Sequence, residues 1–180
     1  MPSSIHEKEL TVARETYIFI NELIDTKNPA VVFANGGTQG HIYISNSAKK
    51  DSLYNLLKSK EKNFKVYKKE EFPERWNYKN ERAGDLLIAA TPGYYIRDND
   101  TFLTTGTTVM GSKFGVHGYD PLIVTDMHGI FYATGPNIKK GMEIPAFQNI
   151  HVYPLMAKIL GLTIPPIDGR LDVLEKVYKR

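Results

Sequence analysis

The sequence predicts an α/β fold, on the basis of two kinds of apolar pattern and one property of its composition. Short apolar segments typical of strands occur at 30–33, 41–44 and 84–90, each bounded by turn-forming residues. Apolar residues at helical spacing occur at 47–60 and 152–160. Hydrophobic residues make up 42% of the 180-residue chain. That content is enough for the buried core of one domain, or of a piece of a larger one.

The first third of the chain is predicted to contain a hairpin. Residues 17–20 are apolar without a clear period, so a short strand and a helical turn both remain open. The segments 30–33 and 41–44 are expected to pair, because the run between them, 35–40, is turn-forming. This run is rich in glycine but lacks the lysine and the spacing of a phosphate-binding loop, so a plain turn is the better interpretation.

A helix and a further strand are expected next, and with the hairpin they form a small α+β unit. Residues 47–60 are predicted to be a helix whose buried stripe consists of Leu53, Leu56 and Leu57, with its lysines facing water. Residues 64–68 predict a strand, which a proline shortly afterwards helps to end.

The second half of the chain is predicted to add strands and one clear helix. Residues 84–90 predict a buried strand, and 94–96 are expected to return beside it in the antiparallel direction. A second buried strand is predicted at 129–134. The apolar residues of 152–160 have helical spacing, and Gly161 suits the left-handed conformation that ends a helix.

Composition excludes several classes of function. Lys and Arg number 23 against 20 Asp and Glu, a net charge of +3, which is too small an excess to imply a nucleic-acid polymer as partner. The absence of cysteine excludes disulfides and thiolate chemistry. The sequence has no apolar run of roughly 18 residues, so no membrane span is predicted. Its first residues contain no signal-peptide core, and these features leave the compartment unassigned.

The segment 115–120 is the strongest candidate for chemistry. His117 has glycine nearby on both sides, and glycine leaves room for an imidazole to approach an ion. Imidazole is the commonest metal ligand among side chains, but a catalytic metal usually needs about three protein ligands. We expect Gly115, Gly118 and Asp120 to shape this loop, with Asp120 either supporting the ligand or fixing a turn. Taken by itself, the loop favours a histidine with a purely structural role.

Three blocks of sequence resemble the nucleotide pyrophosphatase/phosphodiesterase family of the alkaline phosphatase superfamily. They are Phe72–Leu86, Gly115–Pro136 and Ile144–Gly169, which include the runs Arg-Ala-Gly-Asp, His-Gly-Tyr-Asp and Asn-Ile-His-Val-Tyr-Pro-Leu-Met. The resemblance extends from about Glu71 to the end and is thin before Ala30. It implies an α/β chain that is the C-terminal part of an alkaline-phosphatase-like fold. Residues 1–70 would be a small α+β insert, and residues 71–180 would be catalytic core with the metal-ligand loop.

The resemblance also implies a reaction. Family members hydrolyse phosphodiester or pyrophosphate bonds with two zinc ions and a threonine nucleophile, which makes a nucleotide or phosphodiester small molecule the expected partner. His117 resembles a ligand of one zinc ion. The other ligands and the nucleophile precede the matched part, and His6 lacks the aspartate that the family's Asp-His pair would place before it. We therefore identify no catalytic residue in this chain. The isolated chain is expected to be inactive and to hold no zinc. Four threonines invite comparison with the nucleophile but are interpreted as loop residues: Thr104, Thr105, Thr107 and Thr108.

Two alternative functions remain open for this chain. The first alternative is a non-catalytic module that binds a partner or self-associates. Self-association would use apolar core surface that the missing part of the fold leaves exposed. The other alternative is a phosphomonoesterase or sulfatase of the same superfamily, which differs in substrate. Export is suggested by resemblance to bacterial relatives alone.

Several other polar residues are expected to be structural. His41 is assigned to the surface of the hairpin, and His128 and His151 to the ends of secondary-structure elements. Asp85 is expected to fix the turn into its strand by accepting a hydrogen bond from Arg82.

Overall fold

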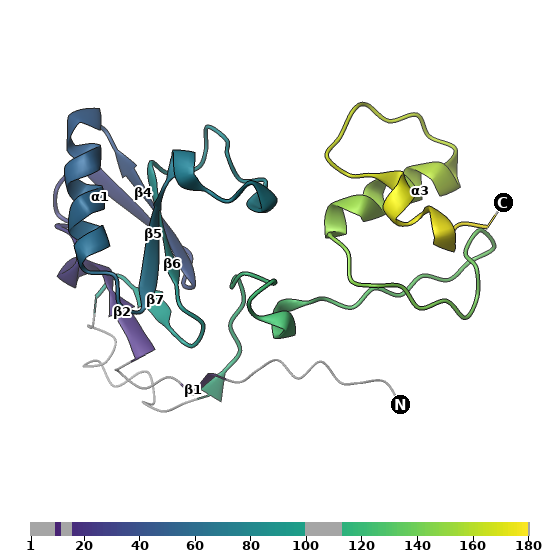
Figure 1. Ribbon diagram of the computed structural model, residues 1–180, viewed down its shortest axis with the longest axis horizontal. Coiled ribbons are helices and arrows are strands. Elements are labelled where there is room, and N and C mark those ends of the chain that lie inside the picture. The colour runs from purple at the N-terminus through teal and green to yellow at the C-terminus, as the bar shows by residue number, and fades with distance from the viewer. Residues whose placement is uncertain (1–9, 12–15, 100–112, 180) are drawn as a thin grey trace. The chain divides into compact units, whose positions relative to one another are not determined.

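The structure is a computed structural model that describes residues 10–11, 16–99 and 113–179. His6 and the four threonines at 104–108 therefore lie outside the described residues. The chain forms two compact units, the first ending at Met127 and the second beginning at His128 (Figure 1).

The described strands are β1 (Leu10–Thr11), β2 (Tyr17–Phe19), β3 (Val31–Asn35), β4 (Gln39–Ile44), β5 (Phe64–Lys68), β6 (Leu86–Ala90), β7 (Tyr95–Arg97) and β8 (Lys113–Phe114). The described α-helices are α1 (Lys50–Ser59) and α3 (Val152–Leu160). Short 3₁₀ helices are η2 (Ile20–Glu22), η3 (Ser47–Lys49), η4 (Lys69–Glu71), η5 (Glu74–Trp76), η6 (Thr125–Met127), η7 (Asn149–His151), η8 (Leu171–Val173) and η9 (Glu175–Val177).

The first unit is built on a four-stranded antiparallel sheet in the order β3-β4-β6-β5. The predicted hairpin is confirmed, since Val31 pairs with Ile44 and Asn35 pairs with Gly40. β6 occupies the middle of the sheet between β4 and β5. The sheet thus combines strands from both sides of residue 70, while the two compact units divide after Met127.

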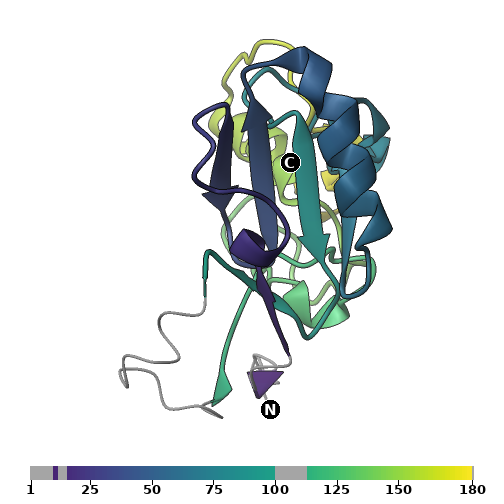
Figure 2. The same cartoon turned by 90° about the vertical axis from the view of Figure 1, so that its left-hand side faces the viewer.

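The main core lies between this sheet and α1, which runs alongside the strands in Figure 2. Alternate residues of a strand point to opposite faces, so Leu86 and Ile88 of β6 meet Leu57 of α1 on one face. Leu87 points to the other face, where it packs with Phe72 from the segment after η4. The sequence 86–88 is buried throughout because both faces of its strand are covered.

The expected antiparallel return of 94–96 beside β6 is wrong. β6 already has a neighbour on each edge, so it has no free edge for a third strand. β7 instead pairs in parallel with β2, Tyr17 opposite Tyr95. Residues 17–20, left open between strand and helical turn, contain both, because β2 runs directly into η2.

The buried strand expected at 129–134 is also wrong, since these residues form no strand and are all exposed. A strand is held by hydrogen bonds to a neighbouring strand, and every described strand belongs to the first unit. Ile130 and Tyr132 expose 49% and 81% of their surface, so no neighbouring strand among the described residues covers the apolar pattern.

The second unit is a small helical cluster. Leu155 of α3 packs against Leu174 and Val177 of the C-terminal 3₁₀ helices. Gly161 ends α3 with a φ of +67°, as predicted. Met156, by contrast, belongs to the predicted apolar stripe of this helix but is 53% exposed.

The stripe predicted for α1 is correct at two of its three leucines. Leu57 is fully buried and Leu53 is partly buried, whereas Leu56 exposes 44% of its surface. On a helical wheel the buried direction lies between Leu53 and Tyr54, and this places Leu56 at the edge of the stripe. Across the described residues, the helices are all too short or too polar to cross a bilayer.

Leu57 and Leu56 provide a matched test of this packing. We expect Leu57→Ala to lower the free energy of unfolding by about 2–5 kcal/mol, because it leaves a cavity in the core. Leu56→Ala should cost less than about 1 kcal/mol, because its side chain is half exposed. Urea unfolding of the chain measures both, and equal losses would contradict the assigned faces.

Candidate functional site

The candidate site is the loop 115–120, which follows β8 and belongs to the first unit. Gly115, His117 and Gly118 are exposed, whereas Tyr119 is buried with 8% of its surface accessible. The loop therefore presents an imidazole to its surroundings while its far end is packed into the core. This exposure is compatible with a metal-ligand role for His117, which remains a prediction.

A buried threonine of the β3–β4 turn holds the loop at His117. The Thr38 hydroxyl donates a hydrogen bond of 2.9 Å to the backbone carbonyl of His117. Thr38 is 2% exposed, and its own carbonyl accepts a 2.8 Å bond from the Ala90 amide. The turn that carries Thr38 is thus tied to the central strand β6, and the His117 carbonyl is tied to that turn.

Gly118 is required by the same contact. Its φ is +96°, a conformation that side chains rarely tolerate. A Cβ at this position would lie 2.5 Å from the Thr38 hydroxyl oxygen. The expectation that Gly118 shapes the loop therefore gains a specific physical reason.

The end of the loop is anchored by Tyr119 and Asp120. The Tyr119 hydroxyl donates a 2.6 Å bond to the Tyr94 carbonyl. The Asp120 carboxylate forms a two-pronged ion pair with Arg75, with 2.8 Å between Nη1 and Oδ1, and it accepts from the Trp76 indole at 3.3 Å.

Asp120 also fixes the turn that follows. Its Oδ1 accepts a 3.0 Å bond from the Leu122 amide, and its backbone carbonyl accepts from the amides of Ile123 and Val124. The Arg75 guanidinium, with further donors from Leu122 and Trp76, lowers the pKa of the Asp120 carboxyl to about 2. A charge so well paired acts as a fixed anchor at physiological pH.

The other polar residues are placed in structural roles. His41 accepts from the Gly84 amide at 3.3 Å through Nδ1, and burial lowers its pKa. His151 accepts from the Arg170 amide at 3.0 Å through Nδ1. Asp85 lies just before β6, and its Oδ2 accepts a 2.8 Å bond from the amide of Ile44, whereas the expected donor was Arg82.

Metal binding requires more than this loop provides. Within residues 10–11, 16–99 and 113–179, no three His, Cys, Asp or Glu side chains gather where they would hold an ion. The His117 imidazole is a suitable zinc ligand, since a neutral imidazole commonly binds zinc. It could supply only one of the several ligands that a zinc site needs. His128 is exposed and belongs to the second unit.

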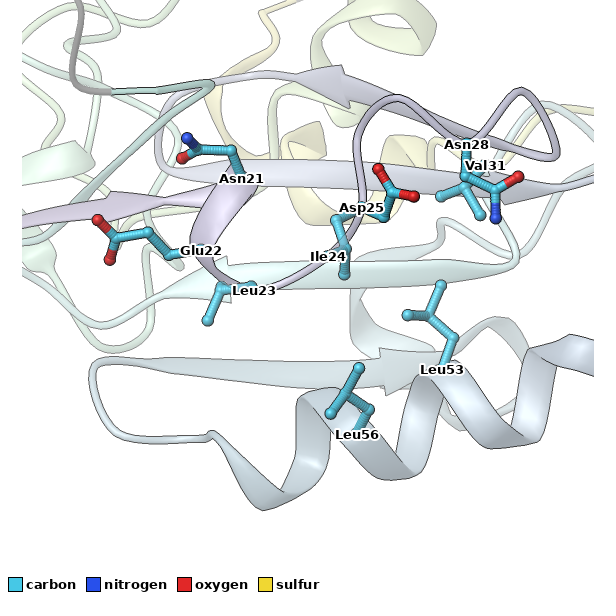
Figure 3. Close-up of a pocket in the computed structure, with 9 residues that line it drawn as sticks. All are labelled: Asn21, Glu22, Leu23, Ile24, Asp25, Asn28, Val31, Leu53 and Leu56. Carbon is cyan, nitrogen blue, oxygen red and sulfur yellow. The ribbon is translucent and has the colours of Figure 1, made fainter.

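A separate pocket of about 520 Å³ lies between η2, its following turn and α1 (Figure 3). Leu53 and Leu56 of the helix form one wall, and Glu22 and Asp25 carry its acidic groups. None of its lining residues comes from 115–120, so it is distinct from the candidate site.

Three residues that hold the loop, Thr38, Arg75 and Tyr94, were not predicted from the sequence. They lie 79, 45 and 25 residues from their partners, so no local pattern links them to the loop. The one available signal was the position of Arg75 in the first family-like block.

Arg75 offers a direct test of the Asp120 anchor. We expect Arg75→Met to raise the pKa of Asp120 toward the ordinary value of 3.8, measured by NMR titration of its carboxyl carbon. Because the folded-state pKa lies below the unfolded one, the ion pair stabilises the fold above pH 3.8 and is lost as the pH falls toward about 2. Arg170→Met, which removes the partner of Asp172 in the second unit, should leave Asp120 unchanged. A wild-type titration curve in the Arg75 variant would contradict the anchor.

Comparison with known proteins agrees with the family-like blocks. The family profile described as type I phosphodiesterase / nucleotide pyrophosphatase matches residues 9–120, more than half of the chain. The match includes residues 9–29, where the resemblance read from the sequence is thin, and it ends at 120, so most of the second block and all of the third lie outside it.

Curated relatives include ectonucleotide pyrophosphatase/phosphodiesterase family member 7 of Rattus norvegicus, 35% identical over 130 residues, covering 72% of this chain and 28% of the relative. The bis(5′-adenosyl)-triphosphatase of Xenopus laevis is 38% identical over 122 residues, covering 67% of this chain and 25% of the relative. The chain thus spans about a quarter of the length of these relatives.

Solved structures show the same fold. Human ectonucleotide pyrophosphatase/phosphodiesterase 5 superposes with a TM-score of 0.78 and 27% identity, covering 94% of this chain and 42% of that chain. An inactive variant of the murine protein, solved in complex with AMP, superposes with a TM-score of 0.76. The chain therefore belongs to the type I phosphodiesterase / nucleotide pyrophosphatase family and carries part of its alkaline-phosphatase-like α/β fold.

Proposed function

We propose that this chain is the C-terminal part of a zinc-dependent phosphodiesterase or nucleotide pyrophosphatase, in which His117 provides one metal ligand. The observation that supports this role is an exposed imidazole on a loop held at three of its residues, once through the backbone of His117 and twice through the side chains of Tyr119 and Asp120, in a chain that belongs to this family. Two zinc ions about 3.5–4 Å apart would neutralise the phosphoryl charge and clamp the attacking and leaving oxygens.

The contribution of this chain is to hold one ligand in a defined place. Thr38 holds the His117 carbonyl, and Tyr119 and Asp120 hold the residues that follow. When the imidazole binds an ion, its own side-chain torsions are then the main degrees of freedom that become ordered. The entropy cost of binding is therefore lower than for a mobile loop.

The substrate class follows from the family. The relatives are named as nucleotide pyrophosphatases and phosphodiesterases, and a murine relative was solved in complex with AMP. A nucleotide or another small phosphodiester is accordingly the proposed substrate. A phosphomonoester or sulfate ester is the alternative for the same type of site.

The isolated chain is proposed to be inactive. The described residues supply no cluster of three ligands, and the nucleophile expected from the family has no counterpart identified in this sequence. We expect the purified chain with added zinc to give no turnover of a chromogenic phosphodiester. Turnover that disappears in His117→Ala would contradict this expectation.

A chimera tests the ligand role. This chain would replace the corresponding segment of the Xenopus laevis relative, to which it is 38% identical. We expect hydrolysis of the phosphodiester that is lost on chelation and in His117→Ala but retained in His151→Ala, and faster than hydrolysis of the matching phosphomonoester or sulfate ester. A folded chimera whose activity survives His117→Ala would overturn the role of His117.

Self-association is a second candidate, favoured by the apolar surface of the second unit. Its helix α3 exposes Tyr153, Met156 and Leu160 by 51%, 53% and 65%. Apolar patches of this kind mark interaction surfaces or aggregation-prone faces. The contacts of the loop 115–120 do not depend on self-association through α3.

Sedimentation of the isolated chain tests this second candidate. Association through this face should weaken in Met156→Gln and Leu160→Gln, because each places an amide on the apolar surface. Lys158→Gln, on the same helix, should have no such effect. A monomer at all concentrations would eliminate this candidate.

A further inference from the structure

We propose that Thr38 is a positioning residue for His117, fixing through its hydroxyl the direction in which the imidazole leaves the backbone. The proposal rests on the proposed function, because it assigns a purpose to a contact made by the expected metal ligand. Of the three anchors of the loop, Thr38 is the one that bonds His117 itself.

Thr38 is itself rigidly placed. Its side chain is buried, with 2% of the residue exposed. Its amide donates to the Gly36 carbonyl at 3.1 Å, and its carbonyl accepts from Ala90 at 2.8 Å. The neighbouring Gly37 carbonyl accepts from the Ile96 amide at 2.6 Å. A hydroxyl on this framework acts as a fixed donor and does not need to be ordered by its partner.

The hydroxyl orients a whole peptide group. The peptide between His117 and Gly118 is planar, so a bond to the His117 carbonyl constrains both ψ of His117 and φ of Gly118. That φ is +96°, and the space where a Cβ would stand lies 2.5 Å from the same hydroxyl oxygen. The hydrogen bond and the absent side chain therefore select one arrangement of the peptide.

The hydrogen bond from Thr38 would orient His117, as other groups orient histidines that bind metals. Such partners usually accept a hydrogen bond from the second ring nitrogen, and replacing them typically lowers metal affinity 10–100-fold. Thr38 acts on the backbone of His117 instead. It fixes the origin of the side chain, and χ1 and χ2 remain as the free torsions.

Three variants of the full chain test the contact. Thr38→Val keeps the size and branching of the side chain and removes the hydroxyl, whereas Thr38→Ser keeps the hydroxyl. Thr91→Val makes the same chemical change at an exposed threonine and is the control. The main readout is the NMR chemical shift of the His117 carbonyl carbon, with the backbone ¹⁵N relaxation of 116–119 and urea unfolding measured in parallel.

We expect Thr38→Val to shift the His117 carbonyl carbon upfield and to increase the mobility of 116–119. Thr38→Ser should restore both, and Thr91→Val should change neither. A wild-type carbonyl shift and wild-type relaxation in Thr38→Val, with the variant folded as judged by urea, would overturn the proposal. Equal loss of order throughout the first unit would also overturn it, because Thr38 would then be a general core residue.

The chimera separates this proposal from the proposed function. In the chimera we expect Thr38→Val to lower zinc affinity by roughly tenfold, measured by competition with a chelator, and Thr38→Ser to restore it. A folded chimera that neither binds zinc nor hydrolyses the phosphodiester would reject the proposed function. A chimera that does both, but whose zinc affinity is unchanged in Thr38→Val, would reject the positioning role.

Discussion

The hydrogen bond from the Ala90 amide to the Thr38 carbonyl links the sheet of the first unit to its candidate site. β6 is the central strand, with β4 on one side and β5 on the other, so Ala90 sits at the end of the best-supported strand. The turn after β3 is tied to that end, and its threonine carries the donor that reaches His117. The backbone position of an exposed histidine is thus determined by a buried sheet, as is usual for loops above a rigid scaffold.

The same arrangement explains why the loop combines an exposed residue with deeply held neighbours. The metal-ligand role proposed for His117 requires an accessible imidazole, and an exposed loop by itself is mobile. Here the residues after His117 are held by a buried tyrosine and by a carboxylate paired with Arg75. Ordering is therefore provided by side chains from other segments, while the imidazole stays accessible.

Elements with local signals were predictable, and elements that depend on distant partners were not. The hairpin of β3 and β4, the helix α1, the strand β6 and the end of α3 at Gly161 all follow from patterns within a few residues. The pairing of β7 with β2 joins segments almost 80 residues apart, and no pattern within 94–96 specifies it. Residues 129–134 have the composition of a strand but pair with no strand among the residues that the structure describes. For the candidate site, the sequence predicts roles for His117, Gly118 and Asp120, which remain predictions, whereas Thr38 and Arg75 became visible when the fold brought them to the loop.

If the sheet fixes this loop, residues 116–120 are already ordered in this chain before any metal or further polypeptide is added. Backbone ¹⁵N order parameters of the isolated wild-type chain test it most directly. We expect values for 116–120 close to those of β6, about 0.85, as for rigid backbone. Values below about 0.6 would show a flexible segment, and would contradict the claim that the sheet fixes the position of His117.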